Sequence, residues 1–96
     1  MAYETEDYQV LHERYGDILK QLHEIECDIG WFEIIDKALS DILRIVYEAD
    51  INLQIVQIKE KFAGLRIYYD IEGDADEETR KQINDAIDRA EIDSYT

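Results

Sequence analysis

Two β-rich runs joined by one short connection constrain this chain more than any other feature of its sequence. Leu53–Lys59 and Leu65–Ile71 are rich in residues that fit a pleated, half-buried sheet, and the connection between them contains Gly64. The second run alternates apolar and polar residues, which is typical of a strand with one buried face. The sequence therefore predicts a β-hairpin over Ile51–Glu72.

The first run breaks this alternation at one point. Ile55 and Val56 are adjacent and both apolar. Either this strand is covered on both faces or a β-bulge shifts its register there. The sequence leaves both alternatives open.

Three other segments show the apolar spacing of amphipathic helices. The first runs from Tyr8 to Ile25 and contains Gly16, which costs about 1 kcal/mol relative to Ala inside a helix. The second runs from about Trp31 to Glu48, and the third begins near Asp76. The order helix, helix, strand, strand, helix predicts an α+β fold, with the helices packed on one face of a small antiparallel sheet.

Two acidic residues are predicted to cap the later helices. Asp28 precedes the second helix and suits its N-cap. Asp74 with Glu77 has the spacing of a capping box, and Glu77 and Glu78 suit the positive end of the third helix.

A single domain over residues 1–96, with residues 1–7 polar and frayed, is expected because the chain has no proline, repeat or low-complexity tract. The only cysteine, Cys27, cannot form an internal disulfide, which favours a reducing compartment. No apolar run reaches membrane-spanning length, and the N-terminus does not resemble a signal peptide. We expect a soluble cytoplasmic protein that does not bind membranes.

The charge of the chain narrows the classes of partner. With 24 acids and 10 bases, the formal net charge is −14. Direct nucleic-acid binding is disfavoured, because affinity for phosphates requires clustered Lys and Arg. A strongly acidic protein can instead bind a basic surface of another protein or nucleoprotein complex, although acidity also serves solubility alone.

Residues able to support catalysis or metal binding are few. His12 and His23 are too far apart to form a metal pair on one helical face, and Cys27 has no cysteine partner. Acids from Asp70 onward resemble a calcium loop, but Ala75 stands where that loop requires Gly. The sequence therefore predicts no enzyme, no cofactor and no metal site.

Two charged groups flank the second β-run. The acidic run after Asp70 is either a solvated turn before a helix or a docking surface for a basic partner. The bases near the hairpin turn either contribute to binding or form ion pairs with neighbouring acids. The candidate partner-binding residues are Asp70, Glu72, Asp74, Asp76, Glu77 and Glu78, with Lys59, Lys61 and Arg66 as secondary candidates.

Aromatic residues give a further criterion for an interface. Trp31 follows a glycine at a helix start and is expected to anchor the core. If Phe32, Phe62 and Tyr68 are exposed, they indicate an interface, since aromatic side chains often dominate binding energy.

Two blocks of sequence resemble a family of small phage and bacterial proteins. Gly30–Asp36 is Gly-Trp-Phe-Glu-Ile-Ile-Asp, and Ile58–Tyr69 contains Lys-Glu-Lys-Phe-Ala-Gly-Leu-Arg. Members of this family carry a Gly-Trp-(Phe/Tyr) helix start, a Lys-Glu-Lys-Phe-Gly-Gly-Leu-Arg hairpin and a closing helix. The blocks and their spacing cover Cys27 to about Ser94. The resemblance implies a phage or mobile-element setting.

This chain departs from the family at two places. Ala63 replaces the usual Gly, which makes a positive φ there less expected. Many relatives continue into a zinc-like Cys-x-x-Cys tail, whereas this sequence ends Glu91–Thr96, so no metal role is carried over.

The leading hypothesis is a non-enzymatic acidic interaction protein. We expect it to be phage-encoded and to inhibit a host defence complex, CRISPR-type or otherwise nucleic-acid-processing, by partial DNA mimicry at a basic surface. One alternative is an immunity protein that neutralises a basic toxin nuclease. The other is a housekeeping domain that forms a homodimer through its sheet.

Overall fold

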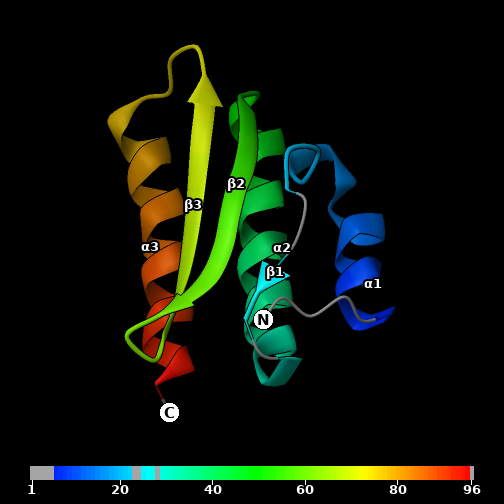
Figure 1. The fold of residues 1–96 in the computed structure, drawn as a ribbon. Coiled ribbons are helices and arrows are strands. Elements are labelled where there is room, and N and C mark those ends of the chain that lie inside the picture. The colour runs from blue at the N-terminus through cyan, green and yellow to red at the C-terminus, as the bar shows by residue number, and fades with distance from the viewer. Residues whose placement is uncertain (1–5, 23–24, 28, 96) are drawn as a thin grey trace.

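The computed structural model describes residues 6–22, 25–27 and 29–95, and the predicted α+β class is confirmed (Figure 1). Its helices and strands are α1 (Glu6–Arg14), β1 (Ile25–Glu26), α2 (Phe32–Ala49), β2 (Asn52–Lys61), β3 (Gly64–Glu72) and α3 (Glu77–Ser94). Two short 3-10 turns, η1 (Gly16–Ile18) and η2 (Ile29–Trp31), precede β1 and α2.

The sheet is mixed rather than purely antiparallel. Its strand order is β1-β2-β3, with β2 and β3 antiparallel as predicted. The additional strand β1 runs parallel to β2 and pairs Ile25 with Ile58. Parallel neighbours need a long crossover connection, and α2 provides it. The segment from β1 to β2 is therefore a βαβ unit that the sequence analysis missed.

One apolar core joins the sheet to the helices. α2 and α3 run in opposite directions behind β2 and β3 (Figure 1). The inward side chains of the sheet are fully or almost fully buried, as are those of the two helices that face them. The largest of these are Leu53, Ile55, Ile58, Leu65 and Ile67 from the sheet and Ile35, Leu39, Ile42 and Ile83 from the helices. Trp31 is partly buried against this core.

A β-bulge resolves the irregular alternation in β2. The pairing register shifts between Ile55 and Gln57. Ile55 is fully buried, whereas Val56 is 41% exposed. The bulge alternative is therefore the correct one, and it lets both Ile55 and Ile58 face the core.

The first helix is shorter than predicted. α1 ends at Arg14 rather than Ile25, and the chain passes into η1 at Gly16, a residue poorly suited to continue a helix. The apolar residues Ile18, Leu22 and Ile25 are buried along the turns that follow. Their spacing indicated a helix because burial selects apolar residues whatever the backbone conformation.

Side chains fix this N-terminal segment to the rest of the fold. The Tyr15 hydroxyl donates to an Asp36 carboxylate oxygen on α2 at 2.6 Å, and Arg14 forms an ion pair with the same carboxylate at 3.1 Å. Gln54 on β2 donates to the Asp17 carbonyl within η1 at 2.7 Å and accepts from the Lys20 backbone N–H after it at 3.0 Å. α1 also includes two residues that were expected to be frayed. His23 and the proposed cap Asp28 lie outside the described residues.

The start of α3 is capped two residues later than predicted. Asp76, not Asp74, is the N-cap, and its carboxylate accepts a hydrogen bond from the Thr79 backbone N–H at 2.7 Å. Gly73, with φ of +88°, provides the turn between β3 and this cap. The predicted capping box of Asp74 and Glu77 is therefore wrong, because Glu77 is already the first helical residue.

The hairpin turn has an unusual backbone. Lys61 pairs with Gly64, which leaves a two-residue connection. Phe62 and Ala63 have φ of 54° and 63°, as a type I′ turn requires at both central residues. The expectation for Ala63 is therefore wrong, because strand pairing fixes the turn despite a cost of roughly 1–2 kcal/mol per left-handed residue.

Candidate functional site

The fold separates the candidate acids from the candidate bases. β3 begins at the hairpin turn and ends beside the start of α3, at the opposite end of the molecule (Figure 1). The nine predicted residues therefore form two surfaces rather than one. We call them the acidic end and the hairpin tip.

The acidic end combines side chains from three elements. β3, the turn after it and the first turn of α3 contribute the six predicted acids, all of them exposed. The C-terminal end of α2 adds Glu48 and Asp50. These two acids lie near the end of β3, because Asn52, two residues after Asp50, pairs with Glu72. The acidic end is thus defined by Glu48, Asp50, Asp70, Glu72, Asp74, Asp76, Glu77 and Glu78. Glu48 and Asp50 can be assigned to this end of the molecule only when the strand pairing of the hairpin is known.

A shallow hollow lies within the acidic end. It has a volume of about 450 Å³ and is bordered by the end of α2 and the start of α3. Four apolar and five polar residues line it: Ile45, Ala49, Ile51 and Ala75, and Glu48, Asp74, Asp76, Thr79 and Gln82. Across the described part of the chain, no group of three or more His, Cys, Asp or Glu is arranged to hold a metal ion.

Some acids at this end already accept hydrogen bonds from other residues of the chain. Glu72 accepts from the Asn52 side chain at 3.1 Å, and Glu78 accepts from Gln82 at 3.4 Å. Hydrogen bonds from the backbone and side chain of Thr79 hold the pKa of Asp76 below its usual value. Asp70 and Asp74 make no such bond with any residue that the structure describes. The same holds for Glu48, Asp50 and Glu77, so these five exposed carboxylates are the most available to a partner.

The hairpin tip presents cations together with aromatic rings. Lys61 Nζ lies 5.6 Å from the ring centre of Phe62, and Lys59 Nζ lies 5.7 Å from that of Tyr68. Both distances are within the range of cation–π attraction. Phe62 is 83% exposed, and Tyr68 is 39% exposed. The hairpin tip is defined by Lys59, Lys61, Phe62, Ala63 and Arg66.

The three bases of the tip differ in their partners. Arg66 forms an ion pair with Glu91 of α3 at 3.0 Å and donates to the Tyr95 hydroxyl at 3.3 Å. The predicted ion pairing with acids is therefore found for Arg66, whereas both lysines lie over rings. Arg66 acts mainly to hold the end of α3 against β3.

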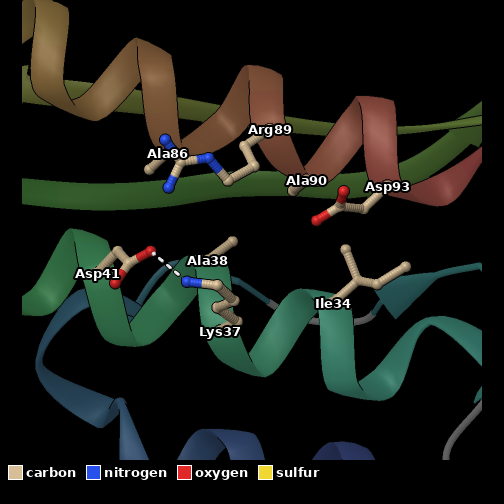
Figure 2. Close-up of a pocket in the computed structure, with 8 residues that line it drawn as sticks. All are labelled: Ile34, Lys37, Ala38, Asp41, Ala86, Arg89, Ala90 and Asp93. Atoms are coloured by element: carbon tan, nitrogen blue, oxygen red, sulfur yellow. Dashed lines mark hydrogen bonds and ion pairs between the residues drawn. The ribbon is translucent and has the colours of Figure 1, made fainter.

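A groove between α2 and α3 is too narrow to be a site. Ile34, Ala38, Ala86 and Ala90 form its floor, and Lys37, Asp41, Arg89 and Asp93 border it (Figure 2). Its volume of about 10 Å³ is no larger than one water requires. Lys37 and Asp41 form an ion pair across one helical turn at 3.4 Å. The small side chains let the two helices approach closely.

The residues that could suggest catalysis belong to neither surface. Cys27 is buried with its sulfur 3.6 Å from the Tyr8 hydroxyl, and His12 lies on α1. Phe32, a possible interface residue, is half-buried against the core. Within the described ranges, no helix has the length and apolar character needed to cross a membrane.

Comparisons with protein-family models, with curated proteins and with solved structures find no match to this chain. The resemblance to small phage and bacterial proteins stays a prediction.

Proposed function

We propose that this chain is a non-enzymatic interaction protein that covers a basic surface of a protein or nucleoprotein complex with its acidic end. The observation that carries the proposal is the gathering of eight acids from α2, β3, the following turn and α3 at one end of the molecule. Charges placed on separate rigid elements keep fixed spacings, which suits recognition of a basic groove.

The finer proposal concerns the partner. A complex that handles nucleic acid carries a basic groove, and partial mimicry of DNA charge blocks such a groove. With the phage setting that the resemblance implies, the partner is a host defence complex, CRISPR-type or otherwise nucleic-acid-processing. The protein then acts as an anti-defence inhibitor by competing with nucleic acid.

The test begins with affinity capture from the cells in which the gene is found, eluted by a salt gradient. We expect a basic nucleic-acid-handling complex released by moderate salt, because exposed charge contacts are screened. With the captured complex purified, the protein should displace a labelled duplex DNA from it. Recovery of a toxin nuclease instead would favour the immunity alternative.

Two variants of equal net charge then test the site. Asp70→Lys/Asp74→Lys alters two acids of the acidic end that make no described hydrogen bond, and Glu13→Lys/Asp88→Lys alters two exposed acids elsewhere. Each substitution adds two charges, so both variants carry −10 instead of −14. We expect the first to weaken binding roughly tenfold or more and the second to leave it nearly unchanged. Equal weakening would show that bulk charge, not the acidic end, governs binding.

A further inference from the structure

The hairpin tip and the hollow of the acidic end carry opposite charge and share apolar character, although they lie at opposite ends of one molecule (Figure 1). We propose that the hairpin tip of one copy binds the hollow of a second copy. This contact needs only the chain itself, and it uses part of the acidic end that is also proposed to bind the basic partner.

The tip has the properties of a ligand. Phe62 is the most exposed of the large apolar side chains that the structure describes, at 83%. The left-handed backbone at Phe62 and Ala63 costs free energy that a glycine turn would avoid. Strain of this kind is typical of sites where a side chain must be presented in one orientation. Lys61 lies against the ring, so one cation accompanies it.

The hollow has the properties of a receptor for that group. The half-buried Ala49, Ile51 and Ala75 line it, with the almost fully buried Ile45 beneath them, and they offer a small apolar contact for the ring within a mostly polar surface. Glu48 and Asp74 on its border can pair with the incoming lysines. The hollow adjoins the C-terminal end of α2, where the helix dipole favours a cation, and the N-terminal end of α3, where it disfavours one. The attraction of the lysines therefore rests on Glu48 and Asp74.

The positions of the two surfaces determine the kind of assembly. A contact between unlike surfaces at opposite ends is heterologous, and it extends into open chains of copies. The net charge of −14 on each copy opposes association at low salt. At about 0.15 M salt the screening length is about 8 Å, so distant repulsion fades while direct contacts survive. Association should therefore increase from low to physiological salt.

Sedimentation velocity of the purified chain tests the proposal over concentrations from about 10 μM to about 1 mM, the range of weak contacts. We expect the average mass at physiological salt to rise past that of a dimer. A tip variant, Phe62→Asn/Lys61→Glu, and a hollow variant, Glu48→Lys/Asp74→Lys, should each stay monomeric. An equimolar mixture of the two should form a one-to-one complex, because it retains one intact tip and one intact hollow.

The design excludes simpler explanations. The hollow variant carries −10, so greater repulsion cannot explain its loss of association. Asn suits the turn at position 62, and Lys suits the C-terminal end of α2, so both variants should keep the wild-type circular dichroism spectrum. Ile92→Asn, at a residue 64% exposed on α3, should associate like wild type.

Three results would overturn the proposal. Wild type could remain monomeric throughout, either variant alone could associate as wild type does, or the mixture of variants could stay monomeric. None of these results bears on the basic partner, because that test uses a different complex.

Discussion

At the acidic end the charges are crowded, and the left-handed backbone positions are Asp50 and Gly73, residue types that tolerate this conformation. At the hairpin tip the charges are few, and the left-handed positions are Phe62 and Ala63, residue types that tolerate it poorly. The chain turns into α3 at Gly73, a residue suited to its φ of +88°, and Asp76 then caps the helix. At the other end of β3, Phe62 and Ala63 adopt positive φ without being glycine. The residue types thus suit the local backbone at one end of the strand pair and do not suit it at the other.

This difference shows which residues the fold itself explains. Asp76 is needed as a cap, and Glu77 and Glu78 suit the positive end of α3. In contrast, the carboxylates of Asp70 and Asp74 make no described contact that stabilises the chain, and the described contact of the Phe62 ring is with the neighbouring Lys61. Substitutions at Asp70, Asp74 and Phe62 can therefore separate binding from folding, and those at the others cannot.

The largest effect should come from breaking the core that both ends share. Ile58 is fully buried on β2, and Ile58→Ala should lower the free energy of unfolding by about 2–5 kcal/mol through lost burial and a cavity. Urea unfolding followed by Trp31 fluorescence and by circular dichroism should give one coincident transition. Two separate transitions would show that the ends do not share one cooperative core.

Relieving the strain in the hairpin turn should raise the stability of the chain, by less than the core substitution lowers it. Phe62→Asn/Ala63→Gly places the residues that type I′ turns prefer, and it should raise the free energy of unfolding by about 1–2 kcal/mol. Thermal unfolding measures the gain. Phe62→Ala is the matched control, because it removes the ring but keeps the backbone cost. If the control gains as much as the double variant, backbone strain is not the cause.

Removing the N-cap of α3 should lower the stability of the chain by less than the core substitution does. Asp76→Ala should lower Tm by roughly 4–8 °C, because the Thr79 backbone N–H loses its acceptor. The pKa of Asp76 is lowered in the folded state, so its stabilising effect is present above the unfolded value of about 3.9 and is lost as pH falls below it.

Asp76→Asn keeps an acceptor but cannot titrate. Its stability should therefore fall less steeply than that of wild type between about pH 5 and pH 2. Equal acid sensitivity in the two proteins would contradict the assigned role.

The smallest effect on stability should come from the acids that the fold does not explain. Asp70→Lys/Asp74→Lys should change Tm by no more than about 2 °C, since both side chains are exposed. Glu13→Lys/Asp88→Lys is the control for net charge in the same thermal melts. A large loss confined to the first variant would mean that these acids stabilise the chain, and it would weaken their assignment to binding.

Local patterns predicted the parts of the fold that depend on local rules. The broad apolar stripe predicted α2 to within one residue at each end. Ile55 next to Val56 indicated either a bulge or a strand covered on both faces, and the structure has the bulge. β1 was missed because its two residues owe their conformation to a parallel partner far along the chain. The end of α1 was missed because buried turns carry the same apolar residues as a buried helix.

The candidate site was predictable only in part, for the same reason. Runs of like charge are visible in sequence, and the acids from Asp70 to Glu78 do lie together. The hollow and the contribution of Glu48 depend on where α2 ends relative to β3, which is a tertiary relationship. The positive φ of Ala63 was unforeseen because side-chain identity alone did not reveal the two-residue register.

The two-residue strand β1 has a consequence for the order of folding. The β2–β3 pairing closes over a short turn, whereas β1 reaches β2 only after the whole of α2. Loop closure over a longer segment costs more entropy, so the hairpin should pair first and β1 should dock late. In hydrogen exchange, β1 should accordingly open more readily than β2 and β3. An opening limited to β1 leaves the strand pair that carries both candidate surfaces in place.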